Sequence, residues 1–117
     1  MTQFDQRGQR VNTQYNVGRD LNFGTVQNSI DLVAELEKLK EEVIRARQNG
    51  ILDEKKSTDV EYQIVKAAQQ AEEPKPDKKT IIDHLTTAKA LIEGLAATGG
   101  LVTAIVAAIE AVQKVFS

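Results

Sequence analysis

The chain has 117 residues, which is enough for one modest domain. Its 15 basic and 17 acidic residues nearly balance, so we do not expect the basic face that marks nucleic-acid binding. The chain has no cysteine, which excludes disulfides, thiol catalysis and cysteine-based metal sites. Residues 1–20 contain no apolar stretch typical of a secretion signal, so we expect a cytoplasmic protein.

A six-residue repeat lies near the start of the chain: residues 15–18, YNVG, recur as residues 21–24, LNFG. Residues 9–12, QRVN, match the same pattern one unit earlier. The apolar residues of the repeat are odd-numbered, so an extended backbone would point them to one face. A segment this short cannot bury that face alone, which favours strand pairing between chains.

We therefore predict an N-terminal β assembly motif over residues 1–28. The residues predicted to carry self-association are Val11, Tyr15, Asn16, Val17, Gly18, Leu21, Asn22, Phe23 and Gly24. The alternation also fits cross-β packing, in which Asn and Gln side chains form ladders. Two other interpretations remain open: a β-hairpin that turns near residues 18–20 and folds onto the helices, and a polar tail without fixed structure.

Helical periodicity follows residue 28, and we predict a helical bundle over residues 29–117. The first helix, 29–49, begins at Ser29 as N-cap and ends at Asn49-Gly50. Its apolar seam is Leu32, Leu36, Leu39 and Val43, widened by Ile30, Val33 and Ile44. The second helix, 58–73, begins where Thr58 and Glu61 have the spacing of a capping box.

Two further helices follow the connector Pro74-Lys75-Pro76, which forbids helix continuation. Asp77 is predicted to cap a third helix over 78–97, and Gly99-Gly100 to separate it from a fourth helix over 101–116. The predicted fold is therefore mainly α, a bundle of about four helices preceded by the β-segment. The fourth helix is apolar on most of its surface, so it is a candidate membrane-binding or partner-binding helix, through Leu101, Val102, Ile105, Val106, Ile109, Val112 and Phe116.

No pattern of catalytic or metal-binding residues stands out. His84 is the only histidine, and a metal site would need further ligands at a compatible spacing. The glycines at positions 18 and 24 match neither a dinucleotide-binding nor a phosphate-binding loop. We expect a protein that is not an enzyme and holds no cofactor or metal.

Residues 94–109 carry no charged side chain. This run of 16 residues is just shorter than the roughly 17–25 that a membrane-spanning helix needs. A helix hairpin packed within the bundle is the favoured interpretation. The alternative is a hairpin that leaves the bundle and enters a membrane only on activation.

Residues 14–24, QYNVGRDLNFG, resemble short motifs found beside effector and signalling domains in multicellular bacteria. Such motifs occur in proteins of bacterial immunity and programmed death, some of them with nucleotide-binding oligomerisation partners. Some are amyloid signalling motifs, similar in function to those of necroptosis adaptors and fungal prion-forming proteins. The helical region also resembles the small effector-associated helical domains of these systems. The resemblance implies assembly without catalytic residues.

Three functions are compatible with these features. The first is a self-assembly or adaptor module in bacterial signalling or defence, pairing with itself as an oligomer or filament, or with a signalling protein that has a similar motif. The second is a membrane-active, pore-forming effector that uses residues 94–116. In membrane-targeting relatives we expect the helices to precede the motif, and here the order is reversed. The third is a structural homo-oligomer.

Overall fold

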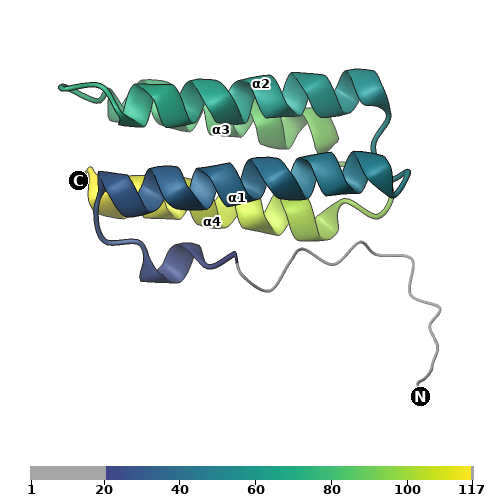
Figure 1. Ribbon diagram of the computed structural model, residues 1–117, viewed down its shortest axis with the longest axis horizontal. Helices are drawn as coiled ribbons and strands as arrows, with labels where there is room; N and C mark the ends of the chain where they lie inside the picture. The colour runs from purple at the N-terminus through teal and green to yellow at the C-terminus, as the bar shows by residue number, and fades with distance from the viewer. Residues whose placement is uncertain (1–20, 117) are drawn as a thin grey trace, which may run out of the picture.

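The computed structural model describes residues 21–116 (Figure 1). This part of the chain forms four α-helices after one short 3-10 turn, and the prediction of a mainly helical fold with four helices is confirmed. The elements are η1 (Phe23–Thr25), α1 (Ser29–Gln48), α2 (Glu54–Ala71), α3 (Lys78–Ile92) and α4 (Gly99–Val115). Helix α1 packs against α2 and α4, and α3 packs against the same two helices, so the bundle closes on itself.

The core of the bundle is aliphatic, and each helix contributes one seam to it. The predicted seam of α1 is buried along its whole length, whereas Ile30, which was expected to widen it, is 79% exposed. Ile30 therefore points away from the bundle. The largest completely buried side chains are Leu32, Leu36, Leu39, Ile64, Ile81, Leu85, Ile92, Leu101 and Ile105.

Helix caps fix where α1 and α3 begin. Asn28, one residue before the predicted Ser29, caps α1: its side chain accepts the N–H of Asp31 at 2.8 Å. Asp77 caps α3 as predicted, and accepts the N–H groups of Lys79 and Thr80 at 3.1 and 3.4 Å. Both starts therefore agree with the sequence to within one residue.

Helix α2 begins four residues earlier than predicted, at Glu54. Its N-cap is Asp53, whose carboxylate accepts the N–H of Lys56 at 2.6 Å. Glu61 does not take part in a capping box, because it accepts a hydrogen bond from the buried hydroxyl of Ser57 at 2.6 Å. The predicted start at Thr58 was wrong because an acidic cap precedes it by more than one turn.

The connection between α3 and α4 also differs from the prediction. Helix α3 ends at Ile92, and the chain then turns through Gly94 and Ala97, which have φ angles of 95° and 66°. The buried Thr98 hydroxyl closes this turn by donating to the carbonyls of Ile92 and Leu95 at 2.9 and 3.0 Å. Gly99 and Gly100 begin α4 instead of separating two helices.

The uncharged run 94–109 is therefore divided between this connection and the first part of α4. In the range 21–116, no helix combines the length and the apolar character needed to cross a membrane.

Residues 21–28 form no strand: the predicted β-segment contains the turn η1 at this point. Residues 1–20, which carry the first two repeat units, lie outside the described residues. The predicted pairing of those units between chains stays a prediction.

Candidate functional site

The third repeat unit lies against the bundle. Residues 21–28, here called the strap, run below α1 and α4 in Figure 1 and lead into α1. Phe23 and Val26 are 4% and 1% exposed and belong to the bundle core, and Leu21 is half-buried against it. The strap is thus a fifth contributor to the core, which the helical periodicity did not predict.

Asparagine and glycine give the strap its local shape. The side-chain oxygen of Asn22 accepts the N–H of Gly24 at 3.0 Å, and the N–H of Val26 bonds to the carbonyl of Phe23 at 3.3 Å. A Cβ atom at position 24 would lie 3.2 Å from that Asn22 oxygen, so the turn favours glycine there. The sequence held a signal for this turn, because Asn readily bonds the backbone two residues ahead.

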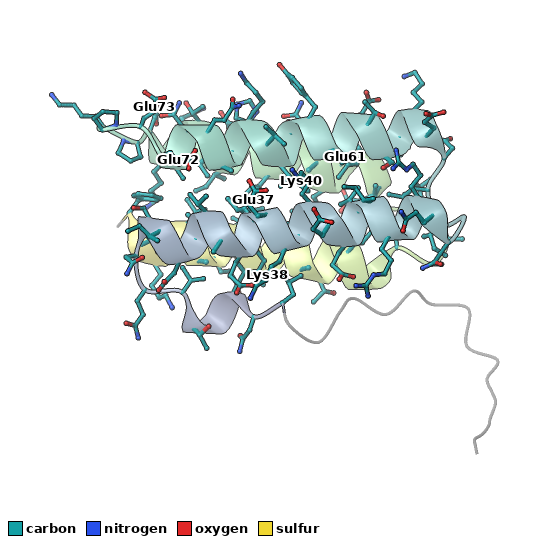
Figure 2. All side chains as sticks on the ribbon, in the orientation of Figure 1. Glu37, Lys38, Lys40, Glu61, Glu72 and Glu73 are labelled. Atoms are coloured by element: carbon teal, nitrogen blue, oxygen red, sulfur yellow. The ribbon has the colours of Figure 1, made fainter. Side chains whose placement is uncertain are left out.

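Three charged side chains bind the strap to the helices, and the first of them, Asp31 at the start of α1, accepts the N–H of Gln27 at 3.2 Å. The N–H of Asn22 donates to Oε2 of Glu35 on α1 at 3.1 Å. Glu35 is 9% exposed, and its other oxygen accepts from Lys38 at 3.1 Å; Figure 2 shows Lys38 on the strap side of α1. Lys114 of α4 donates to the carbonyl of Gly24 at 3.4 Å. Sequence reasoning missed both Glu35 and Lys114, because their partners are backbone groups distant in sequence.

The strap leaves space beside it on α4. One hollow of about 330 Å³ lies between strap residues and the first half of α4, where Gly100, Thr103 and Ala104 line it. A second, of about 260 Å³, lies between Phe23, Gly24 and the second half of the same helix. Ala107 lines both hollows, which lie on the side of α4 that faces the strap.

Only some of the residues predicted to carry self-association lie in the described part of the chain. Leu21, Asn22, Phe23 and Gly24 lie in the strap, and Asn22 and Gly24 are exposed. The other members fall in residues 1–20, outside the described part: Val11, Tyr15, Asn16, Val17 and Gly18.

The candidate membrane or partner residues of α4 divide into two groups. Leu101, Ile105 and Val112 have no exposed surface and form the helix's seam in the core. The remaining four are half-buried: Val102, Val106, Ile109 and Phe116. The helix therefore uses its most apolar face within the bundle.

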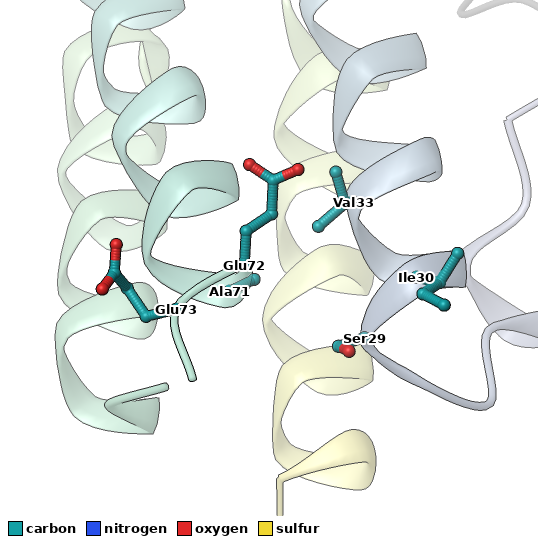
Figure 3. Close-up of a pocket in the computed structure, with 6 residues that line it drawn as sticks. All are labelled: Ser29, Ile30, Val33, Ala71, Glu72 and Glu73. Carbon is teal, nitrogen blue, oxygen red and sulfur yellow. The ribbon is translucent and has the colours of Figure 1, made fainter. Parts of the chain in front are cut away.

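A third hollow, of about 360 Å³, opens where the start of α1 meets the end of α2 (Figure 3). Ile30, Val33 and Ala71 give it an apolar wall, and the carboxylates of Glu72 and Glu73 stand at its edge. Ser29 is the one hydroxyl among its lining residues, and no histidine or lysine stands beside it.

Two further polar contacts lie on the helices of the bundle. His84 bonds through Nδ1 to the side-chain oxygen of Gln63 at 2.8 Å, which ties α3 to α2. Glu37 and Lys40 form a surface ion pair at 3.4 Å on the side of α1 that faces α2 (Figure 2). Within residues 21–116, no group of three or more His, Asp or Glu side chains is placed to hold a metal ion.

Comparisons with protein-family models, with curated proteins and with solved structures find no match to this chain.

Proposed function

We propose that this chain is a non-enzymatic self-assembly module of a bacterial signalling or defence system, acting in the cytoplasm through its N-terminal repeat. The observation that carries the proposal is the repeat itself: apolar residues fall at odd-numbered positions in the first two units (Val11, Tyr15 and Val17) as they do in the third (Leu21 and Phe23). In the third unit that face is covered by the bundle, where Phe23 is buried. The apolar side chains of the first two units also need to be buried, and pairing with the same units of another chain would bury them.

The packing of the described residues supports this proposal. The four helices and the strap bury their apolar seams among residues 21–116. Helix caps at Asn28, Asp53 and Asp77 define three of the helix starts, which suits a folded carrier for an assembly motif. The proposed partners are further copies of the chain, as an oligomer or filament, and a signalling protein that bears a similar motif.

The membrane-active alternative is less well supported. Insertion of α4 would remove Leu101, Ile105 and Val112 from the core and carry Glu110 and Lys114 toward the bilayer. A charged residue at the centre of a membrane helix costs roughly 2.5–3.5 kcal/mol. The packed arrangement already provides an apolar environment for the same seam.

A single substitution in the second repeat unit tests the proposal. Val17→Asp adds a carboxylate to the odd-numbered face, where burial without a partner is unfavourable. Gln14→Asp adds the same charge to the even-numbered face and serves as the control. Phe23 is not suitable for this purpose because it belongs to the bundle core.

Mass is measured by light scattering over a range of concentrations. We expect the mass of the wild type and of Gln14→Asp to rise with concentration, and Val17→Asp to remain monomeric. A Val17→Asp protein with the wild-type mass would show that the proposed interface is wrong. A small fixed mass for the wild type would favour the structural homo-oligomer.

A further inference from the structure

We infer that the bundle restrains assembly by holding the third repeat unit, residues 21–24, in a conformation that cannot pair with another chain. This inference rests on the proposed function, since it concerns how the same motif is controlled. The strap has two mutually exclusive uses. It is either docked on α1 and α4, as here, or extended in register with the first two units.

Backbone hydrogen bonds make the two uses exclusive. In the docked strap the N–H groups of Asn22, Gly24, Thr25 and Val26 all have acceptors: Glu35, the Asn22 side chain, the Asn22 carbonyl and the Phe23 carbonyl. A β-ladder requires the N–H and C=O groups of a strand to bond to the neighbouring chain. These groups must be released from their present partners before residues 21–24 can join a ladder.

The direction of the Phe23 side chain also makes the docked and extended conformations of the strap mutually exclusive. In an extended strap, Leu21 and Phe23 would share a face with the apolar residues of the first two units. In the docked strap, Phe23 is buried among core residues of the bundle. The Phe23 ring can be buried in the bundle core or in an interface between chains, but not in both at once.

Residues 21–24 are held on the bundle by the burial of Phe23 and by two charged side chains. Glu35 accepts from the N–H of Asn22, Lys114 donates to the carbonyl of Gly24, and hollows remain between the strap and α4. The four helical seams are formed by other residues. Release of residues 21–24 therefore takes Phe23 out of the core but leaves the residues of the four helical seams on their helices.

Substitutions on the bundle side test the inference without altering the repeat. Glu35→Ala removes the acceptor of the Asn22 N–H, and Lys114→Ala removes the donor to the Gly24 carbonyl. The two variants change the net charge in opposite directions. If net charge alone controlled assembly, one variant would assemble more readily than the wild type and the other less readily. If release of the strap controls it, both variants assemble more readily. Glu41→Ala, at an exposed position of α1, is the control for Glu35→Ala.

The full-length proteins are compared by light scattering, with amide hydrogen exchange read over residues 22–26. For Glu35→Ala we expect faster exchange there and assembly at a roughly tenfold lower concentration, the effect of losing one hydrogen bond to a charged group. Lys114→Ala should shift both readouts in the same direction by a smaller factor. Circular dichroism verifies that each variant keeps its helices.

Unchanged or weaker assembly in both variants, with a wild type that assembles, would overturn the restraint and leave the proposed function standing. A wild type that remains monomeric at every concentration would overturn the proposed function and the restraint together. Opposite shifts in the two variants would show a charge effect and would also contradict the inference.

Discussion

Asp53 determines where α2 begins, since its carboxylate accepts the N–H of Lys56. We expect Asp53→Ala to lower the free energy of unfolding by about 1 kcal/mol, which is typical of a lost N-cap. Thr58→Ala, at the start predicted from sequence, should change it by less than about 0.5 kcal/mol because Thr58 is exposed within the helix. Urea denaturation of both variants measures the difference. Equal effects would contradict the assignment of Asp53 as the cap.

Asp77 gives the stability of the bundle a dependence on pH. The hydroxyl of Thr80, followed by the backbone N–H of Thr80, lowers the pKa of Asp77 below its ordinary value of 3.8. A carboxyl group with a lowered folded pKa stabilises the fold fully above its unfolded pKa. That contribution is lost as the pH falls below 3.8 through the lower folded value.

We therefore expect the melting temperature of the wild type to fall between pH 4 and pH 2, and that of Asp77→Asn to fall less. Asparagine retains a side-chain oxygen for the cap but does not titrate in this range. Thermal melts of both proteins across this range measure the contribution. If the melting temperatures of the two proteins fall equally with pH, Asp77 is not the source of the pH dependence.

At the scale of the element, the strap is expected to contribute measurably to stability. Phe23→Ala should lower the free energy of unfolding by roughly 1.5–3 kcal/mol, the worth of burying a large apolar side chain. The hollows beside Phe23 allow the site to relax, which keeps the loss below that of a tightly packed core position. Gln27→Ala, at an exposed position of the strap, is the control. Denaturant melts of the two variants should differ; a loss no greater than that of Gln27→Ala would mean that the strap is not docked in solution.

Helix boundaries were predictable wherever one local signal determined them. Asp77 follows a Pro-Lys-Pro connector, and no other residue nearby competes with it as a cap. The start of α2 was missed because Asp53 and the Thr58-Glu61 pair both have capping chemistry. The end of α3 was missed because the turn after Ile92 is closed by Thr98, whose role depends on carbonyls several residues away.

At the scale of the whole molecule, the four seams predicted the bundle because apolar periodicity records which face of each helix is buried. The strap could not be predicted in the same way. An alternating pattern is equally satisfied by pairing between chains and by two side chains packing on a nearby core, as the buried Phe23 and the half-buried Leu21 do. Only the folded bundle reveals that Glu35 and Lys114 lie where they can bind this segment.

Residues 21–28 belong both to the predicted assembly motif and to the bundle. A deletion that removes them therefore tests assembly and folding at the same time. Removing residues 1–28 takes away the assembly motif, but also Phe23, Val26 and the cap of α1. A phenotype lost with that deletion in cells does not distinguish failed assembly from reduced protein abundance. Removing residues 1–20 separates the two causes, since every core residue described here is retained. Residue 20, and not residue 28, is therefore the boundary at which tags, fusions and truncations should be placed.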